Sequence, residues 1–323
     1  MQNKTNFIYL LSIYIISTAI SFLWLGFTDM SYLQSTDGYV IITPDGYYYL
    51  KTIDNIIKDA PIVESSVFCY LFAIPLKLLG TENAKDILFF IPPFFAGTFG
   101  VGAYLFSREF LQNKYAFLAS LLAASNIGAI TRLKVGYFDT DIFVFTLPIF
   151  IIAFGLRYLR NGKQGELVAA ITFAILLSIV YSNGSILLLF SVIGFGVLFL
   201  IDRKNQSAKK LTLWLLLASL ANPDYILGIF SKAELYLTKS ENIADLAYNS
   251  TFGFIAESST VSYVQTMKLI SSDPILFALS IIGLLLLVRQ KREIIVMFPF
   301  LFLGLAAFVL GSRFAPFAAV AVN

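Results

Sequence analysis

The sequence contains no histidine and only one cysteine, Cys69, in 323 residues. A single cysteine excludes an intrachain disulfide. The absence of histidine excludes a Ser/His/Asp triad, a Cys/His dyad and a His-ligated zinc or haem site. Any catalytic group must therefore come from carboxylates, Arg, Lys, Tyr or Ser.

Charged residues are also scarce, at 13% of the chain, whereas apolar residues make up 58% and the mean hydropathy is +0.79. This composition is too apolar for an ordinary soluble globule. Apolar runs of about 20 residues, the length that crosses about 30 Å of hydrocarbon, recur along the chain. The first run, residues 7–27, is typical of a signal anchor that stays in the protein. The sequence thus predicts an all-α polytopic membrane protein.

Run length and flanking charge predict about nine to ten transmembrane helices. The expected spans lie near residues 7–27, 87–107, 115–131, 142–159, 166–182, 184–201, 211–229, 274–288 and 294–311, and the chain ends inside what would be one more. Two long outer loops, 28–85 and 230–273, separate some of these spans. The first loop contains an amphipathic stretch, residues 67–79, that we expect on the membrane surface.

Basic residues gather in alternate connections between the spans. These are Arg108 and Lys114; Arg157, Arg160 and Lys163; Arg203, Lys204, Lys209 and Lys210; and Arg289, Lys291 and Arg292. Basic loops stay on the cytoplasmic side of a membrane, so the acid-rich loops are predicted to face outward. This sidedness, under a net charge of only +3, argues against nucleic acid as a partner.

Four sites stand out on the predicted outer face. They are Asp45 in TPDGYYYL, Arg132 with Asp139 and Asp141 in RLKVGYFDTD, Glu257 in FGFIAES, and Arg313 in GSRF. A D-x-D pair can present two carboxylates to one hard divalent cation such as Mg²⁺ or Mn²⁺.

Each site also has a simpler interpretation. Asp139 and Asp141 are suited to cap the helix expected from residue 142, and Pro-Asp-Gly around Asp45 is a strong turn signal. The tyrosines that follow Asp45 are typical of an interfacial aromatic belt. Arg313 lies where a side chain snorkels to the membrane surface, and Glu257 has no distinctive local pattern.

In this order, the motifs resemble those of the catalytic subunit of oligosaccharyltransferase, most closely the bacterial single-subunit form. In that family DGYYY-like, GY-[FY]-D-x-[DE], I-x-E and R-F motifs follow one another on the outer face. The resemblance covers nearly the whole chain, and GYFDTD flanked by Arg132 is its most specific part. It implies a membrane-embedded, polyprenol-dependent (GT-C) glycosyltransferase in the bacterial inner membrane, with its active face extracytoplasmic.

The resemblance also implies the reaction and its residues. An oligosaccharide would move from a polyprenyl-pyrophosphate carrier to the Asn side chain of an Asn-x-Ser/Thr acceptor protein. The implied metal ligands for Mn²⁺ or Mg²⁺ are Asp45, Asp139, Asp141 and Glu257, and the implied substrate-binding residues are Arg132, Tyr181 and Arg313. Asp45 and Glu257 would also be catalytic, because carboxylates that hydrogen-bond the acceptor amide N–H groups loosen its delocalised lone pair.

The sequence departs from the family pattern at three places. The WWD-type motif of the family's acceptor-binding domain is not matched, because the only tryptophans are Trp24 and Trp214. We therefore expect residues 1–323 to be the transmembrane domain of a truncated copy, with the acceptor-binding domain absent. A helix pair that relatives carry before the Glu-bearing loop is not found around Asn222. Phe254 replaces the usual Thr before the I-x-E motif, and Leu269 replaces the Arg linked to an acidic acceptor requirement.

Two other functions are also compatible with the sequence. One is a related polyprenyl-phosphate-dependent sugar transferase, such as a protein O-mannosyltransferase or a lipid A glycosyltransferase. The other is a transporter with a carboxylate ion site, although the candidate ligands lie in outer loops rather than at mid-membrane.

Overall fold

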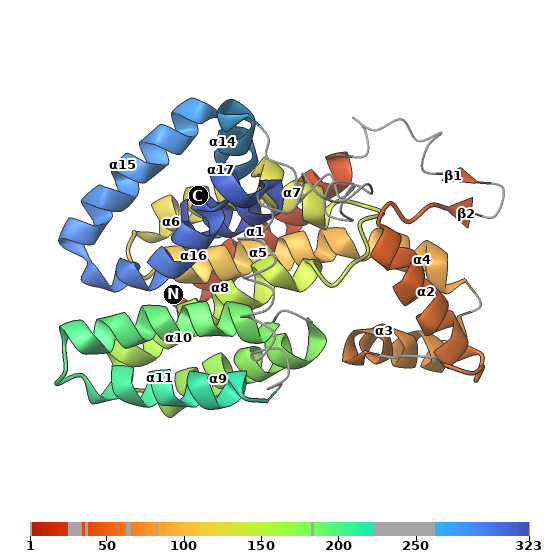
Figure 1. Cartoon of the computed structure of the whole chain (residues 1–323), viewed down its shortest axis with the longest axis horizontal. Helices are drawn as coiled ribbons and strands as arrows, with labels where there is room; N and C mark the ends of the chain where they lie inside the picture. The colour runs from red at the N-terminus through yellow and green to blue at the C-terminus, as the bar shows by residue number, and fades with distance from the viewer. Residues whose placement is uncertain are drawn as a thin grey trace, which may run out of the picture. The chain divides into compact units, whose positions relative to one another are not determined.

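In the computed structural model, residues 2–24, 34–35, 38–62, 66–81, 83–181, 184–221 and 262–322 are described. Most of them are helical (Figure 1). The chain divides into two compact units, one formed by Met1–Ser125, Ala129–Phe150 and Ile179–Ser182, and the other by Asn126–Gly128, Ile151–Ser178 and Asn183–Asn323.

The first unit contains a long N-terminal helix, a small hairpin and a series of shorter helices. Its elements are α1 (Gln2–Leu23), β1 (Gln34–Ser35), β2 (Gly38–Tyr39), α2 (Pro44–Ile57), α3 (Val67–Leu78), α4 (Ala84–Phe90), α5 (Pro92–Ser107), α6 (Asn113–Ala124) and most of α7 (Ile127–Leu133), together with the first part of α8 (Ile142–Asn161). The two-residue strands pair antiparallel, with Gln34 opposite Tyr39. Pro92 separates α4 from α5, because proline begins a helix well but cannot continue one.

Close packing of α1 on α5 gives the first unit its membrane-embedded core. A Cβ added at Gly97 would lie 2.3 Å from the Thr18 hydroxyl oxygen, and one at Gly100 would lie 2.5 Å from that of Ser17. Both glycines are therefore needed for the two helices to approach, as is common where helices pack inside a bilayer.

The second unit contains the rest of α8, most of α9 (Gln164–Val180) and the C-terminal helices. These are α10 (Gly184–Ile201), α11 (Gln206–Ser219), α14 (Tyr263–Ser271), α15 (Pro274–Gln290), η5 (Arg292–Met297), α16 (Phe298–Leu305), α17 (Ala307–Leu310), η6 (Ser312–Phe314) and α18 (Ala315–Val322). Arg157 of α8 pairs with Glu166 of α9 at 3.1 Å, and Arg160 pairs with Glu293 of η5 at 3.7 Å.

Two broken helices are joined at their bends. The α6–α7 pair bends by 61° and the α14–α15 pair by 64°. At these bends the buried Asn126 carboxamide donates to the Ile270 carbonyl at 2.8 Å, and the Ile127 N–H donates to the Ser272 hydroxyl at 3.0 Å. Asn126 Oδ1 also accepts the Gly128 N–H at 2.7 Å. These bonds satisfy backbone groups that the bends leave open.

Five of the described helices are long and apolar enough to cross a membrane, or up to seven if each bent pair is one span. The multi-pass, all-α prediction is thus confirmed, and α10 has the predicted bounds, residues 184–201. The predicted number of nine to ten spans is not confirmed. Helix α9 is 17 residues long, and the predicted span 211–229 runs beyond Ala221, outside the described residues.

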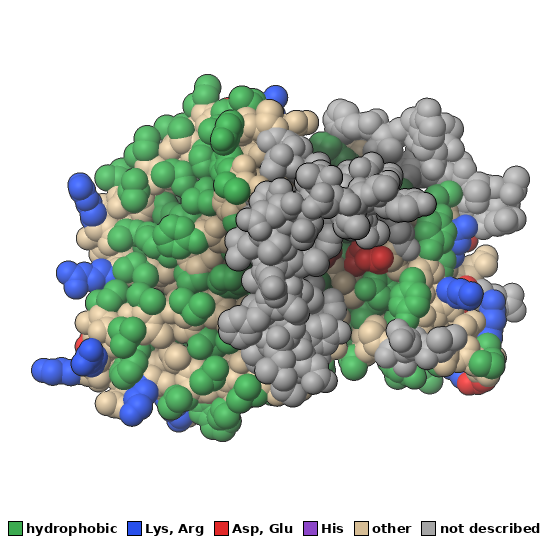
Figure 2. All heavy atoms as spheres, in the orientation of Figure 1, with side chains coloured by type: hydrophobic (Ala, Val, Ile, Leu, Met, Phe, Trp, Pro, Cys, Tyr) green, Lys and Arg blue, Asp and Glu red, His purple; other side chains and the backbone are tan. Residues whose placement is uncertain are grey.

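Lys and Arg side chains gather at one end of the second unit. Arg203, Lys204, Lys209, Lys210, Arg289, Lys291 and Arg292 are all exposed, in the α10–α11 connection, the start of α11 and the α15–η5 connection. Figure 2 shows this cationic edge beside a surface covered by hydrophobic side chains. The predicted stretch 67–79 forms α3, which exposes Leu71, Ile74 and Leu78.

Candidate active site

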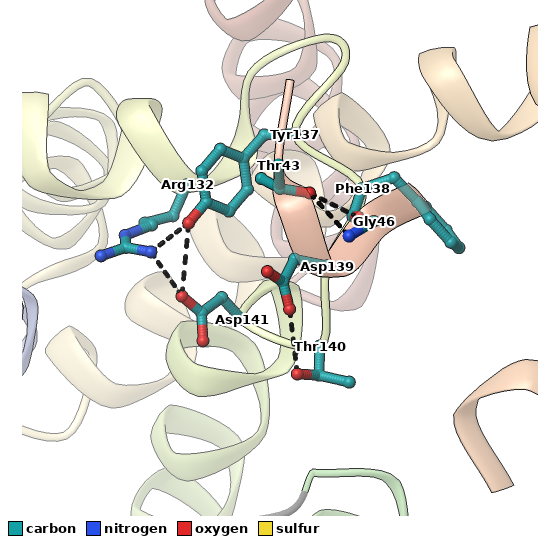
Figure 3. Close-up of polar contacts among 8 residues, drawn as sticks. All are labelled: Thr43, Gly46, Arg132, Tyr137, Phe138, Asp139, Thr140 and Asp141. Carbon is teal, nitrogen blue, oxygen red and sulfur yellow. Dashed lines mark hydrogen bonds and ion pairs between the residues drawn. The ribbon is translucent and has the colours of Figure 1, made fainter. Parts of the chain in front are cut away.

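Helix α2 begins beside the loop that precedes α8, and Thr43 joins the two. As the N-cap of α2, Thr43 accepts the Gly46 N–H on its hydroxyl oxygen at 3.1 Å. The same hydroxyl donates to the Phe138 carbonyl at 3.1 Å (Figure 3). This places Asp45, in the first turn of α2, next to the segment that carries Asp139.

Backbone contacts reinforce this arrangement. The Ile42 N–H donates to the Gly136 carbonyl at 3.0 Å, and the Gly136 N–H donates to the Phe89 carbonyl at 2.8 Å. Gly136 has φ +81° and a Cβ there would lie 2.8 Å from the Phe89 ring, so glycine suits both the backbone and the space. Three segments that are distant in sequence are thus held together at the site.

Asp139 is the most perturbed acid of the site. It is 8% exposed, and its Oδ1 accepts the Thr140 hydroxyl at 3.1 Å. Burial first, and then the Asp141 and Asp45 carboxylates, raise the pKa of Asp139 to about 7. A buried acid crowded by two other carboxylates favours a proton or a cation at this position.

Asp141 has a cationic partner, Arg132, which lies in the last turn of α7. Their side chains are paired at 2.6 Å and are 26% and 13% exposed. The Tyr137 hydroxyl is hydrogen-bonded to Arg132 and lies 3.4 Å from Asp141 Oδ2 (Figure 3). The two acids of the D-x-D motif therefore differ, because an arginine balances the charge of Asp141, whereas Asp139 accepts hydrogen bonds from Thr140 and has no cationic partner among the described ion pairs.

Asp45 and Tyr49 lie one helical turn apart on α2 and so share one face of that helix. Asp45 is exposed, and Tyr49 is hydrogen-bonded to Thr140. Burial raises the pKa of Tyr49 to about 12. Sequence reasoning missed Tyr49 and Thr140; the four-residue spacing from Asp45 to Tyr49 was the available signal.

The structure describes the other expected site residues only in part. Glu257 lies outside the described residues, as does the side chain of Arg313, whose backbone belongs to η6. Tyr181 is buried just after the end of α9.

The described acids do not form a complete metal site by themselves. Over the described part of the chain, no three acidic or cysteine side chains are grouped so that they could hold a metal ion. The oxygen donors of Asp139 and Asp45 do suit a hard divalent cation, and the raised pKa of Asp139 is what such a cation would relieve. The site of four carboxylates stays a prediction, because its fourth ligand, Glu257, lies outside the described residues.

Solved structures of other proteins share this fold. The apo crystal structure of the Archaeoglobus fulgidus oligosaccharyltransferase matches with a TM-score of 0.69 at 16% identity, covering 97% of this chain and 49% of that one. A structure of the same archaeal protein in complex with Zn and sulfate matches with a TM-score of 0.60 at 17% identity, covering 97% and 48%. The predicted GT-C fold class is thereby confirmed.

The relatives found by sequence comparison agree with the structural neighbours. The undecaprenyl-diphosphooligosaccharide–protein glycotransferase of Campylobacter jejuni (strain RM1221) is 23% identical over 355 aligned residues, covering 93% of this chain and 49% of that protein. The chain thus spans about half the length of the curated relatives it matches. The family model "Oligosaccharyl transferase STT3, N-terminal" matches residues 67–261, more than half of the 323 residues. The chain that builds this acidic site is therefore a member of the oligosaccharyl transferase STT3 family.

Proposed function

We propose that the protein transfers an oligosaccharide from a polyprenyl-pyrophosphate carrier to the Asn side chain of an Asn-x-Ser/Thr acceptor. The observation that carries the proposal is the buried Asp139, set beside Asp45 and the Arg132–Asp141 pair in a member of this family. Family membership favours glycan transfer over the transporter and the O-mannosyltransferase alternatives.

The residues divide into two chemical roles. Asp45, exposed at the start of α2, and Glu257 would accept hydrogen bonds from the acceptor amide and so make its nitrogen a better nucleophile. Arg313 would hold the pyrophosphate, whose leaving oxygen gains negative charge as the glycan departs. Arg132 holds Asp141 in place beside Asp139.

The proposed cation is Mn²⁺ or Mg²⁺, held by Asp45, Asp139, Asp141 and Glu257. Carboxylate oxygens are the donors that these ions prefer. When bound, such a cation supplies positive charge that stabilises the departing pyrophosphate. The same charge would allow Asp139 to ionise despite its burial.

We further propose that this site faces away from the cytoplasm, in the inner membrane of a bacterium. The exposed cationic edge of the second unit supports this, since basic connections stay inside. Labelling of a Cys69→Ala, Asp59→Cys variant by a membrane-impermeant maleimide in intact spheroplasts tests the orientation. Absence of labelling in intact spheroplasts, with labelling after lysis, would show the opposite orientation.

A transfer assay tests the reaction itself. The full-length protein, in detergent, is given a polyprenyl-pyrophosphate oligosaccharide, a fluorescent Asn-x-Thr peptide and Mn²⁺. We expect Asp139→Asn and Asp45→Asn to lower the transfer rate by about 100-fold, and EDTA to abolish it. Asp59→Asn is the matched control, because Asp59 is 82% exposed in the same loop region and pairs only with the exposed Lys77 among the described contacts. Undiminished transfer by Asp139→Asn would refute the proposed site.

A further inference from the structure

Two basic connections of the second unit meet at its cationic edge. Helix α10 packs against the segment formed by η5 and α16, and the two run in opposite directions. A Cβ at Gly194 would lie 2.5 Å from the Val296 carbonyl oxygen, and the Phe190 and Phe300 rings lie 6.1 Å apart. This register brings the end of α10 to the level of the start of η5. The exposed cations of this edge come from both connections and are Arg203, Lys204, Lys209, Lys210, Arg289, Lys291 and Arg292.

The acids of the same edge are already engaged inside the protein. Glu166 is paired with Arg157 of α8 at 3.1 Å. Glu293 is paired with Arg160 of the same helix at 3.7 Å. The third acid, Asp202, accepts a backbone N–H of its own connection at 3.3 Å. Within the described part of the chain, the seven exposed cations have no ionic partner, so their charge is available to an external anion.

Exposed apolar side chains continue from these cations along α10 and α11. On α11, Trp214 and Leu217 follow Lys210 by four and seven residues, so the three share one helix face. Trp214 is 44% exposed and Leu217 is 56% exposed. Leu200 and Ile201, at the end of α10, are exposed as well. A phospholipid has the same order of groups, with a charged headgroup followed by apolar acyl chains.

The meeting of the two connections adds something that orientation of the chain does not need. An excess of Lys and Arg in each separate connection is enough to keep it on one side of a membrane. Here connections about 80 residues apart in the sequence place their cations together. Charges closer than the Debye length, about 10 Å at 0.1 M salt, repel one another, and an anion between them removes that repulsion.

We propose that this edge binds phospholipids with an anionic headgroup, of the phosphatidylglycerol type, in the adjoining leaflet. Cations of both connections hold the headgroup phosphate, and the acyl chains lie on Trp214 and Leu217. The binding does not depend on the proposed reaction. A Lys or Arg close to an anionic membrane surface strengthens attachment by about 5-fold, so several together give a measurable preference over zwitterionic phosphatidylcholine.

Quenching of Trp214 fluorescence by brominated lipids tests the proposal on the full-length protein. The sequence has two tryptophans, so a Trp24→Phe variant leaves Trp214 as the only one. This protein is reconstituted into vesicles of phosphatidylcholine with a minor fraction of phosphatidylglycerol. In one preparation the phosphatidylglycerol is brominated, and in the other an equal amount of the phosphatidylcholine is. The ratio of the two quenching efficiencies gives the local enrichment of the anionic lipid.

We expect phosphatidylglycerol to be enriched beside Trp214 by about 5-fold or more. In the same background, combining Arg203→Gln, Lys204→Gln and Lys209→Gln should lower the enrichment below about 2-fold. Lys210 is left unchanged, because it donates to the Gln164 side chain at 3.2 Å and so also joins α11 to α9. Circular dichroism melting verifies that the triple variant is folded.

A matched control removes the same number of charges elsewhere. It combines Lys51→Gln, Lys58→Gln and Lys268→Gln, three exposed lysines outside the cationic edge, and should keep the enrichment. Salt tests the unchanged edge without these substitutions, because about 1 M salt shortens the Debye length to about 3 Å and should remove the preference. Soluble glycerol phosphate at the same bulk concentration as the lipid should not compete, which separates a lipid from a free phosphate group.

Three results would overturn the proposal. The first is equal quenching by the two brominated lipids before any charge is removed. The second is an enrichment that survives both high salt and the folded triple variant. The third is an equal loss in the triple variant and its matched control, which would assign the preference to net charge rather than to this edge. If the triple variant does not fold, the salt series decides.

Discussion

The hydroxyl of Thr43 donates to the carbonyl of Phe138 at 3.1 Å across 95 residues of sequence. It also accepts the Gly46 N–H, so one side chain both begins helix α2 and ties it to the loop of Asp139. The distance between Asp45 and Asp139 therefore depends on a residue that has no charge.

Replacing Thr43 tests this dependence. Thr43→Val keeps the volume but loses both hydrogen bonds, and we expect the free energy of unfolding to fall by about 1–3 kcal/mol. Thr43→Ser retains the hydroxyl and should lose less. Chemical denaturation in detergent, followed by circular dichroism, compares the two. Equal stability of the valine and serine variants would show that the hydroxyl does not act as described.

Gly46 offers a steric test of the same contact. A Cβ at this position would lie 2.5 Å from the Phe138 carbonyl oxygen, a backbone atom that cannot rotate away. Gly46→Ala should therefore push α2 off the loop, lower stability by about 1–3 kcal/mol and reduce glycan transfer. Gly165→Ala is the control, because a Cβ there meets nothing within 4 Å. An alanine at 46 that melts and transfers like the wild type would contradict the close approach.

The pairing of Arg132 with Asp141 predicts a measurable coupling. We expect Arg132→Ala and Asp141→Ala each to lower stability by about 2 kcal/mol, since each leaves a partly buried charge without its partner. The double variant should cost less than the sum of the two. A double-mutant cycle on thermal unfolding measures this coupling, and strictly additive losses would mean that the pair contributes nothing.

The raised pKa of Asp139 predicts how stability depends on pH. The pKa of an unfolded Asp is about 4, whereas burial raises the pKa of folded Asp139 to about 7. Between these pH values the folded state holds an extra proton. The free energy of unfolding should therefore fall as pH rises from about 4 to about 7 when divalent cations are chelated.

Thermal melting across this pH range, in EDTA, checks the expectation. Asp139→Asn should remove this contribution to the slope, whereas Asp59→Asn should leave it. Added Mn²⁺ should oppose the loss of stability near pH 7, because the bound ion replaces the proton. A wild-type slope that Asp139→Asn does not alter would contradict the assignment.

The link between the two bent helices can be tested separately from the acidic site. Asn126→Ala removes the bond to the Ile270 carbonyl and the acceptor for the Gly128 N–H, and we expect a loss of about 1–3 kcal/mol because these groups are buried. Hydrogen exchange should accelerate in α14 and at the start of α15. Asn113→Ala is the control, since Asn113 bonds only to the Asn6 side chain among the described contacts, at 3.3 Å. Unchanged exchange in α14 would show that Asn126 does not hold the bend.

The regular helices could be predicted from the sequence, because the length of an apolar run and its flanking charges are local signals. The predicted start of a helix at residue 142 and the bounds 184–201 agree with α8 and α10. The α6–α7 pair was predicted as one continuous span, 115–131, and the residues of α14 were predicted as part of the outer loop 230–273, because the bends at Asn126 and Ser272 are held by contacts between distant segments.

The acids of the site could be predicted from the sequence, but the differences between their surroundings could not. The spacing of Asp139 and Asp141 suggested two equivalent ligands, whereas only Asp141 pairs with Arg132. The tyrosine run suggested an aromatic belt, which the exposure of Tyr47 suits, but Tyr49 points to Thr140. No local pattern encodes a contact whose partner lies about 90 residues away along the chain.

The backbone bonds from Ile42 to Gly136 and from Gly136 to Phe89 also set an order of events during synthesis. A ribosome makes α2 long before it reaches Gly136, so the newly made helix has neither its tether nor the partner of its cap hydroxyl. Asp45 therefore has no Asp139 beside it until the intervening helices have been made and have entered the membrane. The acidic site is thus a late product of biogenesis, and a chain stalled before residue 136 would carry the first half of the site without the means to assemble it.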